Sequence, residues 1–253
     1  MVRIECREVW KRFDDKRVLS GVNLTIEPGE TVVIIGQSGT GKSVLLKHIV
    51  GLLRPDRGAV FVDGENVAKM SRKKLFELRM RFGMVFQSAA LFDSLSVLGN
   101  VGLGIREHTE KTDEEITQIC DEKLRMVGLE SVGNKFPAEL SGGMKKRVGF
   151  ARAIAMNPQC VLYDEPTTGL DPIMSDVINN LIIKLSSELK ITSVVVTHDL
   201  ASAYKVGHRI AMLHDGAVIF QGTPDELRET DHPLVRQFIE GRAEGPIAVG
   251  SVE

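Results

Sequence analysis

The sequence predicts an α/β domain with a mostly parallel core sheet, because short β-branched runs alternate along the chain with helical segments. Most of these runs are continuously apolar, which is expected of strands buried on both faces. The 253 residues, 43% hydrophobic and 26% charged, are ordinary for a soluble globular protein with a proper core. The runs that we predict as strands are residues 31–36, 59–64, 82–87, 160–165, 193–198 and 209–222.

The remaining elements are predicted from turn and capping signals. Asp215-Gly216 separates two apolar runs and predicts a hairpin within residues 209–222. Strand signals disappear between Ser88 and Pro158, where a mainly helical block interrupts the α/β pattern. Inside that block Thr112–Glu115 forms a capping box and Gly128 ends the helix. A second capping box, with proline at the first helical position, begins at Thr223.

The segment GQSGTGKS at residues 36–43 fits the pattern of a phosphate-binding loop. An apolar strand precedes it and a helical segment follows it, which is the context that this loop requires. Its glycines let backbone N–H groups curl around phosphate oxygens, and the helix N-terminus adds partial positive charge. We expect Lys42 to reach the β- and γ-phosphates of ATP and Ser43 to ligate Mg²⁺.

Three further residues with ionisable side chains lie at the ends of predicted strands. Asp164 and Glu165 close the run CVLYDE, and His198 closes SVVVTH. Asp164 is expected to organise the metal, and Glu165 to act as general base on a water that attacks the γ-phosphate. His198 is expected to contact the γ-phosphate or that water. An acid pair that merely caps a loop, and a structural histidine, are the alternatives.

Composition limits the other classes of function. The net charge of −2 gives no electrostatic argument for a nucleic-acid partner. The three cysteines form no CxxC pair, which favours buried thiols in a reducing compartment. No stretch approaches the roughly 18 apolar residues of a membrane helix, and the charged N-terminus lacks a secretory h-region. We therefore expect a cytoplasmic protein that acts at a membrane only through a partner.

Six motifs in register carry a resemblance to the nucleotide-binding subunit of ABC transporters. They are GQSGTGKS, MVFQ, LSGGM, CVLYDE, TTGLDP and VVVTHD, and the similarity extends from about residue 4 to residue 227. The resemblance implies a P-loop NTPase with a RecA-like core at about residues 1–88 and 158–225. It also implies an antiparallel β subdomain near the N-terminus and an inserted helical subdomain at about residues 89–157. Residues 226–253 would form a C-terminal extension.

The resemblance also implies the roles of individual residues. Phe13 looks like the aromatic side chain that stacks on adenine, where the family usually has tyrosine. Gln87 resembles the Q-loop glutamine, which contacts Mg²⁺ or the water and senses the membrane partner. Asp171 looks like the D-loop aspartate, which joins the two sites of a dimer. The cofactors would be ATP and Mg²⁺, with catalytic roles for Glu165, His198, Gln87 and Lys42. The nucleotide-contacting loop would comprise Gly36, Gln37, Ser38, Gly39, Thr40, Gly41, Lys42, Ser43 and Val44, and the metal ligands Ser43, Gln87 and Asp164.

The motif LSGGM resembles the family's signature motif, which acts across a dimer. The resemblance implies that two subunits pack head to tail, and that Ser141, Gly142 and Gly143 of one would cap the γ-phosphate held by the other's P-loop. The physical argument agrees, because Ser141 caps a helix whose N-terminus attracts anionic oxygen. An ordinary N-capped surface helix is the alternative. Met144 departs from the family's commonest glutamine and cannot donate a hydrogen bond.

Met144 and the tail VRQFIEGRAEGP (235–246) narrow the resemblance to the ATPase of Mla-type, Mce-associated phospholipid transporters. That implies an integral membrane permease, a periplasmic Mce-type lipid-binding protein and, in some systems, a small STAS-domain subunit. The ATPase would lie on the cytoplasmic face of the inner membrane. Its tail would hold the partner ATPase or else be a frayed terminus. We expect the permease to contact residues 88–99, where Leu91 and Phe92 are either exposed or core residues.

Two other functions remain open at this point. An ATPase of an amino-acid or other small-solute importer shares the core motifs, and only Met144 and the tail weigh against it. A soluble ABC ATPase of iron–sulfur assembly is similar in size, whereas repair and translation members carry insertions or second domains that are lacking here.

Overall fold

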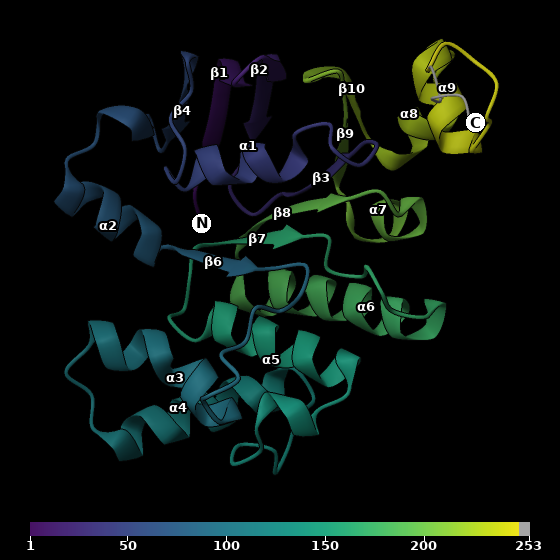
Figure 1. Ribbon diagram of the computed structural model, residues 1–253. Coiled ribbons are helices and arrows are strands. Elements are labelled where there is room, and N and C mark those ends of the chain that lie inside the picture. Colours follow the sequence, from purple (N-terminus) through teal and green to yellow (C-terminus); the bar gives the residue numbers. More distant parts are fainter. Residues whose placement is uncertain (248–253) are drawn as a thin grey trace.

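A six-stranded sheet passes through the centre of the molecule, with strand order β10-β9-β3-β8-β7-β6 (Figure 1). The computed structural model describes residues 1–247. Neighbouring strands from β9 to β6 pair in parallel, and β10 joins β9 antiparallel through the predicted hairpin. The strands are β3 (Thr31–Ile35), β6 (Phe82–Val85), β7 (Cys160–Asp164), β8 (Thr192–Thr197), β9 (Arg209–His214) and β10 (Ala217–Gly222).

Alternate residues of the central strands enter two separate hydrophobic cores. Val33 of β3 packs into a core that contains α6 (Pro172–Leu189), whereas Val32 and Ile34 pack into a core that contains α1 (Lys42–Ile49). Every residue of β3 and β8 is buried, because helices cover both faces of the sheet (Figure 1). Burial on both faces explains why the sequences of the two strands are unbroken apolar runs. The arrangement of helices on both sides of the sheet confirms the predicted α/β class.

One predicted strand lies in a different sheet from the one expected. Residues 59–64 were expected among the doubly buried strands, but β4 (Arg57–Val62) pairs antiparallel with β1 (Ile4–Phe13). Their sheet has the order β2-β1-β4-β5, with β2 at Lys16–Ile26 and β5 at Glu65–Asn66. Val60 and Val62 are buried, but Phe61 faces outward, with the Arg7 guanidinium 4.6 Å from its ring centroid. The apolar run therefore suggests a strand buried on both faces, although Phe61 on its outer face is covered by the Arg7 guanidinium rather than by a second core.

The connection from β6 to β7 is helical. It carries α3 (Val97–His108), α4 (Asp113–Met126), a 3₁₀ turn η2 (Pro137–Glu139) and α5 (Gly142–Ile154). Both reciprocal hydrogen bonds of the Thr112–Glu115 capping box are present at the start of α4. The 3₁₀ turn η1 (Val67–Lys69) and helix α2 (Arg72–Met80) precede β6 and were not predicted individually.

The C-terminal part contains three short helices, α7 (Leu200–Val206), α8 (Pro224–Glu229) and α9 (Pro233–Glu240). The Thr223 capping box is present at α8. Residues 242–247 turn back onto α9, where the Gln237 side chain accepts the N–H of Ile247 at 2.6 Å and donates to its carbonyl at 3.1 Å. The remaining residues of the predicted tail, 248–253, lie outside the described part. Within residues 1–247, no helix is both long and apolar enough to cross a bilayer.

Candidate functional site

The loop that joins β3 to α1 requires glycine at two positions. A Cβ atom on Gly36 would lie 2.3 Å from the carbonyl oxygen of Leu213, and one on Gly41 would lie 2.8 Å from that of Val18. Gly41 also has φ near +101°, a conformation that other residues rarely adopt. The backbone therefore approaches its neighbours too closely for any side chain at either position. Parts of the loop line a pocket of about 380 Å³ together with Gln87, Glu165 and His198.

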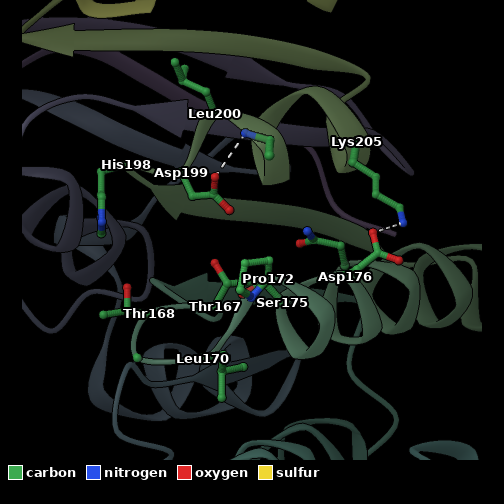
Figure 2. Close-up of a pocket in the computed structure, with 13 residues that line it drawn as sticks. Thr167, Thr168, Leu170, Pro172, Ser175, Asp176, His198, Asp199, Leu200 and Lys205 are labelled. Atoms are coloured by element: carbon green, nitrogen blue, oxygen red, sulfur yellow. Dashed lines mark hydrogen bonds and ion pairs between the residues drawn. The ribbon is translucent and has the colours of Figure 1, made fainter. Parts of the chain in front are cut away.

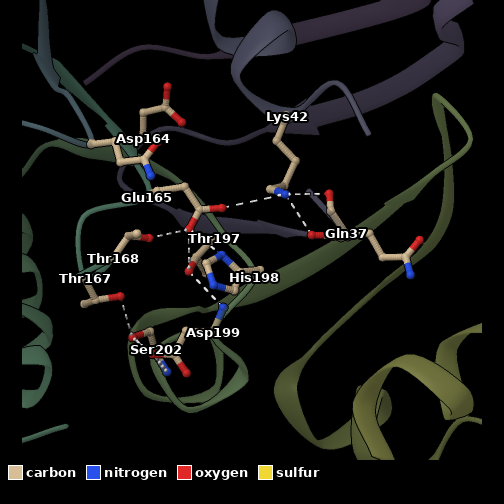
Figure 3. A network of polar contacts seen from close by, with 12 residues as sticks. Gln37, Lys42, Asp164, Glu165, Thr167, Thr168, Thr197, His198, Asp199 and Ser202 are labelled. Carbon is tan, nitrogen blue, oxygen red and sulfur yellow. Dashed lines mark hydrogen bonds and ion pairs between the residues drawn. The ribbon is translucent and has the colours of Figure 1, made fainter. Parts of the chain in front are cut away.

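Lys42 lies at the first turn of α1 and is 6% exposed. Its Nζ donates to the carbonyls of Gly36 and Gln37 at 2.7 and 2.9 Å, and lies 3.7 Å from Oε1 of Glu165 (Figure 3). Burial lowers the pKa of the ammonium, and the nearby Glu165 carboxylate opposes that shift. The loop thus holds a desolvated cation, which is attracted more strongly to phosphate than one in bulk water.

Glu165 accepts three side-chain hydrogen bonds at one oxygen. His198 Nδ1 lies 2.9 Å from Oε2, Thr168 Oγ1 donates to it at 3.1 Å and Thr197 Oγ1 at 3.5 Å (Figure 3). The backbone at Glu165 has φ near +49°, and its N–H is anchored to the carbonyl of Val196 at 2.9 Å. A strained non-glycine residue at the end of β7 is costly, by about 1–3 kcal/mol, and such strain clusters at functional sites. Glu165 is therefore oriented into the pocket as a general base must be.

Ser43 and Asp164 form the predicted metal-binding pair. Ser43 Oγ donates to Asp164 Oδ1 at 2.7 Å, which brings together the end of β7 and the start of α1. Across residues 1–247 no cluster of three or more His, Cys, Asp or Glu side chains offers a complete metal cage. A hydroxyl and one carboxylate suit Mg²⁺, which is usually held by few protein ligands plus substrate phosphates and waters.

Several predicted residues lie apart from this cluster. Phe13, 40% exposed at the end of β1, is outside the lining of the P-loop pocket, and Lys11 Nζ lies 5.4 Å from its ring centroid. Asp171 caps α6 by accepting the N–H groups of Ile173 and Met174 at 2.9 and 3.0 Å. Ser141 caps α5, accepting the N–H of Met144 at 3.3 Å.

The signature segment and the P-loop of one chain lie on opposite sides of the central sheet. Helix α5 belongs to the core on the α6 side, whereas α1 belongs to the other core (Figure 1). Ser141 and Gly142 are exposed, while Met144 is partly buried against the core on its own side. Met144 therefore has a packing role that its sequence position did not reveal.

A second pocket, of about 740 Å³, adjoins the first at His198 (Figure 2). It lies between the loop 167–172, helix α6 and the start of α7. Next to it Ile173 is 77% exposed and Val177, one helical turn further, is 40% exposed. Two exposed apolar side chains of α6 therefore lie on adjacent helical turns beside this pocket.

Sequence reasoning missed four residues of the site. Thr168 and Thr197 bond Glu165, and Lys16 and Val18 of β2 line the P-loop pocket. Thr168 lies within TTGLDP, but the motif alone assigns no role to its hydroxyl. Lys16 and Val18 carry no motif, and their position depends on how the antiparallel sheet packs beside the loop.

Comparisons with known proteins identify relatives over nearly the whole chain. A family profile described as ABC transporter matches residues 19–168. The probable ribonucleotide transport ATP-binding protein mkl of Mycobacterium tuberculosis is 43% identical, over 98% of this chain and 69% of its own. The intermembrane phospholipid transport system ATP-binding protein MlaF of Haemophilus influenzae is 40% identical, over 96% of this chain and 92% of its own. A dimeric ATP-binding cassette solved with ADP and Pi has a TM-score of 0.80 and 36% identity, covering 87% of this chain and 98% of its own.

Proposed function

Because this chain belongs to the family of ABC transporter ATPases, which hydrolyse ATP to drive transport, we propose that it powers phospholipid movement between two membranes. The observation that carries the ATPase chemistry is the single carboxylate of Glu165, held between Lys42, Thr168 and His198. The support for a phospholipid cargo is the similarity to MlaF, whose length the chain covers almost completely.

The catalytic roles follow from the contacts within the P-loop pocket. Lys42 and the loop amides bind the β- and γ-phosphates, and Ser43, Asp164 and Gln87 hold Mg²⁺, which neutralises charge on those phosphates. Glu165 takes a proton from the attacking water, and His198 orients the Glu165 carboxylate and contacts the γ-phosphate. Phe13 stacks on the adenine at the edge of the site.

A second copy of the chain completes the site. Ser141, Gly142 and Gly143 lie across the sheet from their own P-loop, and the helix N-terminus at the exposed Ser141 and Gly142 suits an anion held by another subunit. The apolar surface at Ile173 and Val177 adjoins Asp171, so the D-loop lies where two copies would pack head to tail. Dimeric cassettes among the similar solved structures support this arrangement.

The remaining partners and the location belong to the same proposal. An integral membrane permease docks near residues 88–99, where Phe92 is 53% exposed. A periplasmic Mce-type lipid-binding protein and a small STAS-domain subunit complete the assembly. The ATPase lies peripherally on the cytoplasmic face of the inner membrane, and its C-terminal extension helps to hold the dimer together. The similarity to MlaF favours phospholipid transport over small-solute import and over iron–sulfur assembly.

The name of mkl gives ribonucleotides, rather than phospholipids, as its cargo, so the test must distinguish these two cargoes. The ATPase is purified with its membrane partner and reconstituted with liposomes that contain fluorescent phosphatidylethanolamine and phosphatidylglycerol. We expect ATP-dependent transfer of phospholipid between liposome populations, lost in the Glu165→Gln complex. ATP-dependent uptake of radiolabelled ribonucleotide without lipid transfer would replace the lipid cargo and leave the ATPase assignment intact.

A further inference from the structure

Two cationic side chains of helix α5 donate hydrogen bonds to three backbone carbonyls of the Q-loop. Lys146 Nζ donates to the carbonyl of Gln87 at 2.6 Å. Arg152 donates through its two terminal nitrogens to the carbonyls of Ala89 and Ala90, both at 2.6 Å. The Q-loop is therefore fastened to the same helix that begins at the signature residue Ser141.

The fastened segment has an unusual backbone. Ala89 and Ala90 both have positive φ, near +62° and +48°. Each such residue costs about 1–3 kcal/mol and persists only where its surroundings impose it. Arg152 of α5 donates hydrogen bonds to the carbonyls of both strained residues, so this helix supplies a constraint that maintains their conformation. The Q-loop backbone is consequently set by α5 rather than by its own sequence preference.

Lys146 is distinctive among the lysines of α5 because it is only 6% exposed. Burial lowers the pKa of its ammonium, and the charge on Glu165 opposes that shift. A buried ammonium is unfavourable unless it has a hydrogen-bond partner, and the Gln87 carbonyl is that partner for Lys146. The neighbouring Lys145 is partly exposed, so the two lysines of this motif have different environments.

We propose that Lys146 is a positioning residue for ATP hydrolysis, which fixes the Q-loop at Gln87 to the helix that carries Ser141. Lys146 contacts a backbone carbonyl, so it acts on the reaction through Gln87 rather than directly. This link connects the pocket that contains Gln87 to the helix that presents Ser141. The inference rests on the site roles proposed above for Gln87 and Ser141.

The test compares Lys146→Met with wild type and with Lys146→Arg in the complex with the membrane partner. Lys146→Met removes the donor while keeping an apolar chain of similar length, and arginine restores a donor. We expect kcat of the methionine variant to fall by about tenfold, the scale of one lost hydrogen bond to a charged group. The KM for ATP should stay within about twofold and the arginine variant should recover most of the loss, since nucleotide contacts are unchanged.

A direct readout is amide hydrogen exchange over residues 86–91, where the Ala89 N–H bonds the Phe86 carbonyl. Exchange there should accelerate in Lys146→Met, because opening of a loop depends on the contacts that hold it. Lys123→Met is the matched control: Lys123 is 4% exposed in α4 and pairs with Glu122. It should leave both the exchange of residues 86–91 and kcat unchanged.

Three outcomes decide between the proposals. Wild-type kcat and exchange in Lys146→Met would overturn the positioning role, as would an equal loss in Lys123→Met. Gln87→Ala is measured in parallel and should be impaired if Gln87 has its proposed role. Full activity of Gln87→Ala would overturn the site assignment of Gln87, whereas an impaired Gln87→Ala beside a normal Lys146→Met would overturn the Lys146 role alone.

Discussion

His198 Nδ1 lies 2.9 Å from Oε2 of Glu165, while the other oxygen of that carboxylate lies 3.7 Å from Lys42 Nζ. The end of β7 therefore meets the end of β8 and the start of α1 at a single side chain (Figure 3). Parallel strands bring their carboxyl ends to one edge of the sheet, which is where α/β proteins bind ligands. We therefore expect ATP hydrolysis by this chain to depend on how that one carboxylate is held.

Replacing Glu165 by glutamine would remove the proposed base and keep the shape of the side chain. Losing a positioned base typically lowers a rate by about 10²–10⁴-fold. We expect Glu165→Gln to bind ATP normally, to lose turnover and to accumulate an ATP-bound dimer, as measured by phosphate release and size-exclusion chromatography. Full hydrolysis by the variant in the assembled complex would contradict the role of Glu165.

Thr168 tests whether the orientation of Glu165 matters as well as its charge. Thr168→Val removes the hydroxyl that donates to Oε2 at 3.1 Å and preserves the β-branched shape. A hydrogen bond to a charged group contributes about 1.5–3 kcal/mol, so kcat should fall at least tenfold while the KM for ATP changes little. Thr117→Val, which removes a hydroxyl from the exposed face of α4, is the control. Equal kinetics for the two variants would exclude an orienting role for Thr168.

The three cysteines should be inert in the folded protein. Burial raises the pKa of the Cys6 thiol to about 12 and that of Cys120 to about 11, and it raises the pKa of Cys160 further still. Since the thiolate is the reactive form, an aromatic disulfide reagent at pH 8 should label none of them quickly and all three after unfolding in guanidinium. Rapid labelling of the native protein would show that a thiol is accessible.

The same shifts predict a pH dependence of stability with a definite sign. The folded thiols keep their protons to higher pH than the unfolded ones, whose pKa is near 9. Their contribution to the free energy of unfolding is therefore complete below pH 9 and is lost as the pH rises towards 11–12. Denaturant titrations between pH 8 and pH 10.5 should show falling stability, less so in a Cys6→Ala, Cys120→Ala double variant. Identical slopes in the two proteins would contradict this assignment.

Asp164 tests the proposed metal site. Asp164→Asn keeps an oxygen near Ser43 Oγ but removes the negative charge that a hard cation prefers. We expect chelation of Mg²⁺ to stop hydrolysis in wild type, and the variant to need about tenfold more Mg²⁺ for half-maximal activity, as for other changes near a metal. An unchanged Mg²⁺ requirement would remove Asp164 from the metal site.

The sequence predicted the central sheet well because its signals are local. The runs at β3 and β8 are buried on both faces, and the loop between β3 and α1 has glycines where a Cβ atom would collide. The placement of β4 was wrong because outward-facing Phe61 is covered by Arg7, which lies 54 positions earlier in the sequence. Cation–π cover of that kind depends on tertiary pairing and leaves no periodic signal in either segment.

The site was predicted where a motif carries the chemistry and missed where contacts are distant in sequence. Lys42, Ser43, Asp164, Glu165 and His198 lie together in the structure as their motifs indicate. The contact of Lys146 with the Gln87 carbonyl joins residues 59 positions apart, and it uses a backbone atom that no sequence pattern reports. Backbone acceptors become visible only when the chain path is known.

The head-to-tail arrangement predicts that two different defective chains can make one good site. Lys42→Ala disables the P-loop of its own chain, and Ser141→Arg disables the phosphate-capping surface that it presents to the partner. In a mixed dimer one site combines both defects, whereas the other combines an intact P-loop with an intact Ser141. Both chains also carry Glu165→Gln, so that bound ATP is trapped, and the occluded ATP per dimer is counted. The Lys42→Ala homodimer and the Ser141→Arg homodimer should each occlude none. The mixed dimer should occlude one ATP. If Ser141→Arg homodimers occlude ATP as the unmodified dimer does, Ser141 does not cap a phosphate across the interface. If the mixed dimer occludes none, each chain caps its own ATP.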